Sequence, residues 1–255
     1  AEAGANFSRY SYRIDRFDNY YDVFGRLVAQ EREKLDAPEG FNLGSISAAL
    51  VHDNSYFGLT APLNGSRYRI GLEKYFGAFD FYSATVDLRK YIYTKPVSFA
   101  FRALHQGRYG QDANNISPLY IGSPWYIRGY DFNDATELLL QNGNSINQMF
   151  GSKLLVSNFE IRIPFTGPER LALIKSKFLF TDLAFFVDGG VAFNTFKDFQ
   201  SGIESSESFS ALPVFSAGAS LRLNLFGEMI LEPYYAFPLQ KNTQGTFGLN
   251  IIPGW

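Results

Sequence analysis

The stretch V-F-S-A-G-A-S-L-R-L-N-L, residues 214–225, decides the fold class of this chain. Every odd position from Phe215 to Leu225 is apolar, and every even position from Ser216 to Asn224 is small or polar. Successive side chains of a β-strand point to opposite faces, whereas a helix would mix these two sets on its surface. The stretch therefore predicts a β-strand with one apolar face and one polar face.

The same period of two recurs along the chain. In the tail Thr246–Trp255 it places four large apolar side chains on one face, namely Phe247, Leu249, Ile251 and Trp255. About eleven segments follow this pattern, near residues 5–14, 20–33, 41–52, 66–76, 79–92, 96–109, 152–165, 177–194, 212–225, 228–239 and 245–254. Most are longer than the roughly 5–6 residues of a soluble strand and reach the roughly 9–11 that a bilayer-crossing strand needs. Their length favours a membrane.

The polar face of these segments separates two kinds of β-barrel. A soluble sandwich or lipocalin-like barrel also alternates apolar and polar residues, but its polar face is the outer one. Here the polar face carries single charged residues such as Arg67, Arg69 and Glu73 among many small ones. That composition is typical of a wet barrel lumen.

The connections between the segments fall into two classes. Tight ones lie at Thr94–Pro96 and Phe226–Gly227, and long polar ones lie at 110–150 and 195–211. Outer-membrane barrels have short periplasmic turns and longer outer loops. The sequence therefore predicts an all-β fold, an antiparallel transmembrane β-barrel of about 10–12 strands over residues 1–255, with the 110–150 loop folded into the lumen.

Composition agrees with this prediction and excludes one class of partner. The 255 residues include 26 Phe, 16 Tyr and 23 Gly, as aromatic girdles and tightly turned strands would require. A net charge of −2 offers no basic footprint, so no nucleic-acid partner is expected. No stretch approaches the roughly 20 consecutive apolar residues of a membrane-spanning helix. The N-terminus AEAGANFSRY lacks a signal-peptide core, so we expect the numbering to begin on a mature or trimmed chain.

The residues that could carry catalysis are few. The chain has no Cys, which removes a Cys nucleophile and Cys-ligated zinc together. Its two histidines, His52 and His105, stand in no motif with a Ser and an acid and form no H-x-x-x-H pair. We expect no catalytic residues, no metal site and no cofactor.

Four motifs follow one another in a characteristic order. They are W-Y-I-R-G-Y at 125–130, N-F-E-I-R-I-P-F at 158–165, F-F-V-D-G-G-V-A-F at 185–193 and the tail at 215–255. The first resembles the (V/I)-R-G-(F/Y) signature of a long inward loop, the second the strand after that loop, and the third the F-x-D-x-G strand of the bacterial surface antigen family. This family comprises the C-terminal outer-membrane barrels of the BamA and TamA type. More narrowly, the chain is similar to barrels that end larger periplasmic proteins in Bacteroidota.

The resemblance implies a site where the loop meets the barrel wall. Glu160 and Asp188 each lie between apolar residues that face lipid, so parity alone places the two acids in the lumen. In the family pattern the loop arginine, here Arg128, reaches inward acids of this kind, and a guanidinium fork suits carboxylates on separate strands. The loop motif consists of Ile127, Arg128, Gly129 and Tyr130.

Two further features are expected to shape the barrel. Gly189 and Gly190 would let the inward loop approach the strand backbone closely. Parity assigns an outward face to Phe215, Leu221, Leu223, Phe247, Leu249 and Ile251. Arginine at Leu223 should then cost about 2–4 kcal/mol near the bilayer midplane, and arginine at the inward Ser220 much less.

The resemblance also implies a role. A full barrel of this type is expected to have sixteen strands, so this chain would be part of one, with the missing portion at its N-terminus. The expected function is insertion or translocation of polypeptide in the outer membrane, or anchoring of a periplasmic partner; the alternative is a passive pore or structural barrel. Expected partners are outer-membrane lipid, unfolded outer-membrane protein clients and periplasmic subunits. The closing strand Thr246–Trp255 would form one side of a weak seam that templates an incoming strand.

Overall fold

The structure is a computed structural model, and it describes residues 1–130, 146–199, 211–225, 227–239 and 244–251. Apart from two short 3-10 helices, η1 (Ile146–Met149) and η2 (Phe196–Phe199), the regular elements of these residues are strands. They are β1 (Glu2–Tyr10), β2 (Ile14–Tyr21), β3 (Leu27–Leu35), β4 (Phe41–Asp53), β5 (Tyr56–Phe57), β6 (Pro62–Gly77), β7 (Phe81–Thr94), β8 (Val97–Tyr109), β9 (Leu119–Tyr120), β10 (Phe150–Gly151), β11 (Lys153–Gly167), β12 (Ile174–Lys175), β13 (Phe180–Phe193), β14 (Val214–Leu225), β15 (Met229–Pro238) and β16 (Thr246–Ile251).

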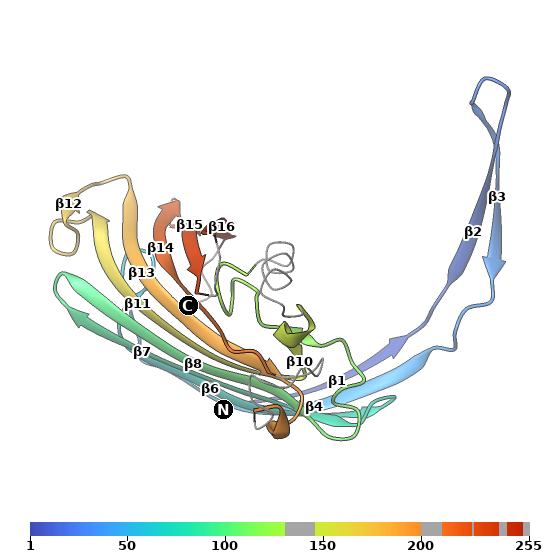
Figure 1. Cartoon of the computed structure of the whole chain (residues 1–255), viewed down its shortest axis with the longest axis horizontal. Helices are drawn as coiled ribbons and strands as arrows, with labels where there is room; N and C mark the ends of the chain where they lie inside the picture. Colours follow the sequence, from blue (N-terminus) through green and yellow to red (C-terminus); the bar gives the residue numbers. More distant parts are fainter. Residues whose placement is uncertain (131–145, 200–210, 226, 240–243, 252–255) are drawn as a thin grey trace.

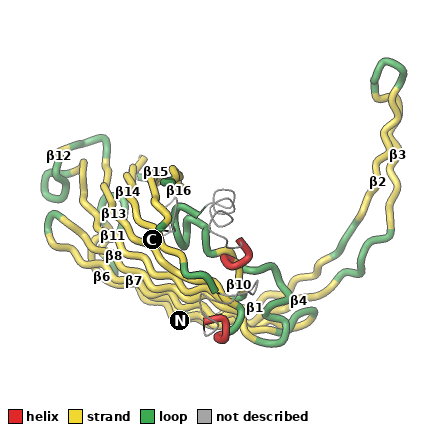
Figure 2. The backbone as a smooth tube through the Cα atoms, viewed as in Figure 1, coloured by secondary structure: helices red, strands yellow, loops and turns green. Residues whose placement is uncertain are grey.

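One large sheet dominates the molecule. Its path is β1-β4-β6-β7-β8-β11-β13-β14-β15-β16, antiparallel throughout, with β5 added to β6 and β12 added to β11. Figures 1 and 2 show this sheet curving into an open trough, with the connection between β8 and β11 on its concave side. Among the described residues β1 and β16 are the edge strands and do not pair with each other. The all-β fold class and the antiparallel sheet of 12 strands confirm the prediction.

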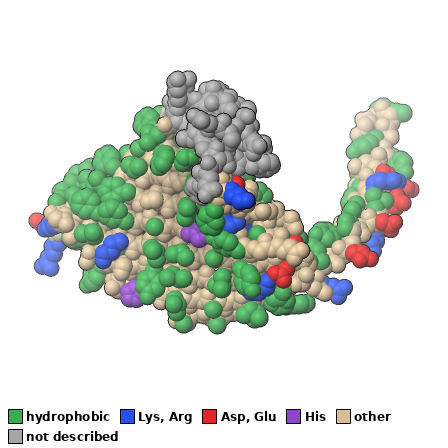
Figure 3. Space-filling model, turned by 60° about the horizontal axis from the view of Figure 1, so that its bottom comes forward, with side chains coloured by type: hydrophobic (Ala, Val, Ile, Leu, Met, Phe, Trp, Pro, Cys, Tyr) green, Lys and Arg blue, Asp and Glu red, His purple; other side chains and the backbone are tan. Residues whose placement is uncertain are grey.

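The two faces of the sheet differ as the period of two requires. On β13, Phe185 is 47% exposed while its neighbour Phe186 is 2% exposed. The register pairs Phe186 with Glu160 and Phe185 with Ile161, so the alternation continues from strand to strand. Figure 3 shows the convex face, where hydrophobic side chains lie across the sheet and few charged ones appear. The convex face is the apolar one.

The N-terminal part departs from the sequence prediction. The segment predicted at 5–14 falls largely on β1, an edge strand of the large sheet, but the segment predicted at 20–33 is interrupted by a turn at residues 22–26. There β2 and β3 pair as a separate ribbon that projects from the trough (Figure 1). Asp22 causes the turn, because its Oδ1 accepts hydrogen bonds from the backbone N–H groups of Phe24 and Arg26 at 2.8 and 2.9 Å. Gly25 completes it with a φ of 76°.

A hydrophobic core lies on the concave face, where a barrel lumen would be. Ile121, Ile127 and Tyr130 from the long connection are fully buried there, against Leu154 of β11 and Val214 of β14. The described part of the 110–150 connection is therefore an inward loop that fills this face. The remainder, residues 131–145, lies outside the described residues.

Candidate functional site: the inward loop and its ion pairs

The backbone of the inward loop is bent to aim Arg128 at the sheet. The N–H groups of Tyr126 and Ile127 both donate to the carbonyl of Ser123, at 2.8 and 3.0 Å, which forms a tight turn just before the arginine. Gly129 then takes a φ of 90°, and a Cβ there would lie 2.9 Å from the Cβ of Ala236. Both the left-handed conformation and the close approach favour glycine.

Arg128 forms ion pairs with acids of three strands. Its Nε lies 2.8 Å from Oδ2 of Asp188, and its Nη1 lies 2.8 Å from Oε1 of Glu160. A second contact to Asp188, from Nη2 to Oδ1 at 2.9 Å, makes that pair bidentate. Glu232 of β15 is farther away, at 3.4 Å, and the guanidinium stacks on the Phe186 ring at 3.5 Å. The structure thus brings the loop arginine to both acids that the sequence singled out.

Two further arginines complete this cluster, and sequence analysis did not assign them a role. Arg162 of β11 and Arg222 of β14 also pair with Glu160, at 2.7 and 2.9 Å. Arg222 reaches Glu232 as well, at 3.1 Å. Arg162, Arg222 and Glu232 all occupy inward positions of the period-two pattern. Parity places Arg162 in the lumen and would place Arg222 and Glu232 there too, but the contacts of Arg222 with Glu160 and of Glu232 with Arg128 depend on the curvature of the sheet and the path of the loop.

The cluster is dry and close to electroneutral. The side chains of Arg128 and Glu160 are 3% and 0% exposed, and those of Arg222 and Asp188 are 0% and 1% exposed. Burial alone would lower the pKa of Arg128, but the charges of Asp188 and Glu160 raise it above the usual arginine value. Three guanidinium groups thus face the carboxylates of Asp188, Glu160 and Glu232 in a space without water contact. Such charges are stable only when all of them are paired.

Hydrogen bonds to backbone carbonyls hold the rest of the loop. The Tyr130 hydroxyl donates to the carbonyl of Phe215 at 2.7 Å, and Asn158 donates to the carbonyl of Tyr126 at 2.7 Å. Arg102 of β8 donates to the carbonyl of Trp125 at 2.8 Å, although the Trp125 side chain itself is 52% exposed. The loop is therefore attached to β8, β11, β13 and β14, not through Arg128 alone.

The two glycines singled out on β13 face opposite ways. A Cβ on Gly190 would lie 2.4 Å from the carbonyl oxygen of Leu155 on β11 and 3.0 Å from Cδ1 of Ile121, so both the neighbouring strand and the inward loop approach this glycine closely. Gly189 is on the convex side, where a Cβ would lie 2.6 Å from the Phe215 ring. The expectation of a loop contact therefore applies to Gly190, and Gly189 instead makes room for an outward ring.

The closing strand presents its apolar side chains outward. Phe247, Leu249 and Ile251 of β16 are 68%, 55% and 55% exposed. Trp255 lies outside the described residues. On the inner side of β16, a Cβ on Gly248 would collide with the Tyr234 ring of β15, which explains the glycine there.

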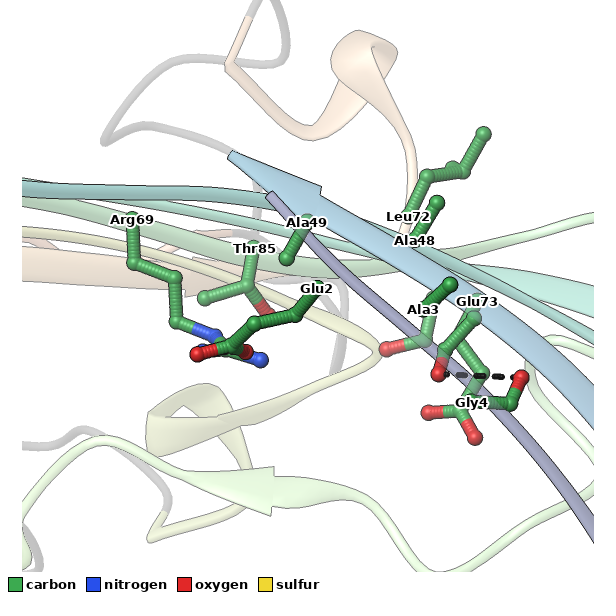
Figure 4. A pocket seen from close by; sticks show the side chains of 12 residues that line it. Glu2, Ala3, Gly4, Ala48, Ala49, Arg69, Leu72, Glu73 and Thr85 are labelled. Atoms are coloured by element: carbon green, nitrogen blue, oxygen red, sulfur yellow. Dashed lines mark hydrogen bonds and ion pairs between the residues drawn. The ribbon is translucent and has the colours of Figure 1, made fainter. Parts of the chain in front are cut away.

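The other end of the trough is open and wet. A cavity of about 200 Å³ lies on the inner side of β1, β4, β6 and β7. Figure 4 shows Glu2 beside Arg69 in this cavity, with Glu73 farther along near Gly4. The Glu2–Arg69 pair has a distance of 2.6 Å but side chains 55% and 50% exposed.

The described residues offer no other obvious chemistry. They contain no group of three or more His, Cys, Asp or Glu side chains that could hold a metal ion. His105 is engaged with the Leu154 carbonyl at 2.9 Å and the Tyr109 hydroxyl at 2.6 Å. No helix in the described part of the chain has the length and apolar character needed to cross a membrane.

The fold and the site together define a class. A curved antiparallel sheet with an apolar convex face, a polar concave face and an inward loop held by buried ion pairs is typical of outer-membrane β-barrels. The profile of the Omp85 superfamily domain matches residues 1–251. The chain belongs to the Omp85 superfamily, which confirms the family that its motifs resemble. Members of this superfamily are outer-membrane proteins. A comparison with curated proteins gave no match.

Proposed function

We propose that residues 1–255 form the outer-membrane barrel region of a protein that inserts or translocates polypeptide, or anchors a periplasmic partner, without covalent chemistry. The observation that supports this most directly is the inward loop, whose Arg128 is shared by Asp188 and Glu160 at 2.8 Å each. A purely structural barrel wall does not need such a costly buried charge. In this proposal the loop holds the sheet near the closing strand in one shape.

The second part of the proposal concerns the edge of β16. This strand has six residues and, within the described chain, pairs only with β15. An unpaired strand edge is a template for an incoming strand, because its free N–H and C=O groups can extend the sheet. Clients would be unfolded outer-membrane proteins, and the convex face would contact outer-membrane lipid.

Cross-linking to a client strand tests this proposal. The chain has no Cys, so Leu249→Cys and Ile251→Cys each supply a single thiol on β16. Ile70→Cys is the matched control, because Ile70 is an outward apolar residue, 44% exposed, on the interior strand β6. Reconstituted in liposomes with a cysteine-bearing client, the two β16 variants should form client adducts and Ile70→Cys should not. Equal adduct yields at all three positions would refute strand templating.

A passive pore remains the competing function, and one observation favours it. The cavity of about 200 Å³ beside β1 is polar and includes Glu2, Glu73 and Arg69. A pore predicts steady conductance in planar bilayers that Arg128→Ala leaves unchanged, without any client adduct at β16. Conductance that rises when Arg128 is removed, together with adducts at β16, favours the assembly role.

A further inference from the structure

The connection between β4 and β6 has the burial of a core element. Thr60 and Ala61 in this connection are 2% and 3% exposed, and Leu63 at the start of β6 is 8% exposed, whereas connecting segments normally run over the surface. We call residues 58–63 the strap. Next to it, Tyr56 is 77% exposed, so the burial begins abruptly. The strap is therefore packed against other parts of the protein and is not a surface turn.

A bend at Gly65 sends the strap across the concave face. Gly65 has a φ of 111°, and a Cβ there would lie 2.5 Å from the carbonyl oxygen of Asn54. Beyond this bend β5 and the first residues of β6 form a small hairpin, closed by a hydrogen bond of 2.8 Å from Gly58 to the Ala61 carbonyl. The strap is the tip of this hairpin.

Four strands that do not pair with β6 hold the strap. The Thr60 hydroxyl donates to the Asp182 carboxylate of β13, and Asn224 of β14 donates to the Leu59 carbonyl at 2.7 Å. Two further donors are Ser98 of β8, which reaches the Leu63 carbonyl at 2.7 Å, and Arg162 of β11, which reaches the Pro62 carbonyl at 3.2 Å. A Cβ on Gly167 would collide with the Leu59 side chain, so this glycine provides part of the seat.

Arg162 connects the strap with the inward loop. Its Nη1 donates to the Pro62 carbonyl, while its Nε lies 2.7 Å from Glu160, which in turn pairs with Arg128. All three charged side chains are at most 3% exposed. The strap and the loop enter from opposite ends of the sheet and share one hydrogen-bonded chain. Members of such a network are energetically coupled, because each polarises and positions the next.

We infer that the strap is a second inward latch and that its seating helps to hold Arg128 in place: when the strap leaves, Arg162 loses a partner, Glu160 reorients and the loop loosens. This rests on the proposed function only in treating the loop as the movable element. Loss of the contacts made by Thr60 and Leu59 should therefore loosen the inward loop, although neither residue contacts Arg128 directly.

The sequence supplies a specific reporter of the loop. Arg128 is the only Lys or Arg from Gly110 to Ser152, so tryptic cleavage after Arg128 measures exposure of the loop and nothing else in that region. Thr60→Val replaces the hydroxyl with a methyl group of similar size, and Leu59→Asp places a charge in the seat. We expect both to raise the initial rate of cleavage after Arg128 in the folded, membrane-reconstituted protein by at least about tenfold, which corresponds to about 1.4 kcal/mol in the opening equilibrium.

Two controls keep the test specific. Thr60→Ser retains the hydroxyl and Tyr56→Ser changes an exposed neighbour, so both should be cut at the wild-type rate. Seating of the strap itself is read by adding Ala61→Cys to each variant and measuring modification by a membrane-impermeant maleimide. Near-complete protection is expected with Thr60→Ser and rapid labelling with Thr60→Val. Heat-modifiable gel migration identifies variants that have not folded, and Thr60→Val decides the question if Leu59→Asp is among them.

Four outcomes are distinguishable. Labelling at Ala61→Cys with unchanged cleavage after Arg128 would show that the strap moves without affecting the loop, and would overturn the inference. Rapid labelling of Ala61→Cys with Leu59 and Thr60 unchanged would overturn the seat itself. Rapid cleavage after Arg128 in the wild-type protein would instead contradict the loop lock of the proposed function. Joint release of strap and loop in Thr60→Val supports the coupling.

Discussion

The two halves of the concave face carry the same kinds of residue in very different surroundings. On β11 to β15 the inward ion pairs lie under the loop, and Glu160 and Arg222 are fully buried. On β1, β4 and β6 the described residues leave such pairs open, and Glu2 and Arg69 are about half exposed. The Glu2–Arg69 distance, 2.6 Å, is no longer than the 2.9 Å of Arg222 and Glu160. The distance between the charged atoms therefore does not show which ion pair contributes more to stability.

Burial decides their energetic weight. Exposed pairs contribute roughly 0–1 kcal/mol, whereas removing one partner of a buried pair costs roughly 3–5 kcal/mol because a charge is left without compensation. The loop and the strap thus turn ordinary lumen charges into a lock. Four substitutions test this difference between the halves.

Arg128→Ala should have the largest effect, a loss of about 3–5 kcal/mol in the free energy of unfolding. Among the described residues Arg128 is the only cation paired with Asp188, while Glu160 keeps two other arginines. Denaturant titration in detergent measures the loss, and chymotryptic cleavage at Tyr126 reports the loop, since the tryptic site disappears. Arg128→Lys should rescue only partly, because an ammonium cannot fork across two acids. A loss below about 1 kcal/mol would place this pair with the exposed ones.

Val86→Arg should cost about 2–4 kcal/mol, because Val86 is on the outward face. Thr85→Arg is its matched control on the same strand, since Thr85 lines the cavity beside Glu2. The pair Leu223 and Ser220 does not give such a contrast, although parity predicted a much smaller cost for arginine at Ser220. Ser220 is inward but 3% exposed and donates to Glu232 at 2.8 Å, so arginine there should also be costly. Folding titrations into liposomes would contradict the face assignment if Val86→Arg and Thr85→Arg cost the same.

Arg102→Ala should have an intermediate effect of about 1.5–3 kcal/mol, the range for hydrogen bonds to charged groups. Arg102 is 7% exposed and shares Asp87 with Arg89, whose presence keeps Asp87 paired after the substitution. The Arg102→Ala variant also loses the hydrogen bond to the Trp125 carbonyl, so trypsin should cleave the loop after Arg128 more readily. An effect as large as that of Arg128→Ala would mean that the boundary between the halves lies nearer β7.

Arg69→Ala should have the smallest effect, about 0–1 kcal/mol, and the effect should shrink further in high salt. Its pair with Glu2 faces the open cavity. The urea midpoint at low and high ionic strength is the measurement. A loss above about 2 kcal/mol would show that another part of the protein covers this half and that the pair is buried.

The sequence located most of this architecture because its signals are local. Alternation identified the long strands β4, β6, β7, β8, β11, β13, β14, β15 and β16, but not the two-residue strands β5, β9, β10 and β12, and it gave outward residues such as Phe185 and Leu249. The same parity put Glu160 and Asp188 on one face, and the motif around Arg128 pointed to a partner for them. The prediction of one long strand at 20–33 is wrong, because alternation gives no sign of the turn that Asp22 stabilises between β2 and β3.

What only the tertiary structure decided is which inward residues meet. Period two fixes the face of a side chain, but neither the curvature of the sheet nor the path of a connection is written in it. Arg222 and Glu232 reach the Arg128 cluster because the sheet curves, and the strap reaches Asp182 because Gly65 bends it across four strands. Contacts between residues so far apart in sequence depend on the packed chain as a whole, so a local pattern names the participants and the fold alone selects the pairs.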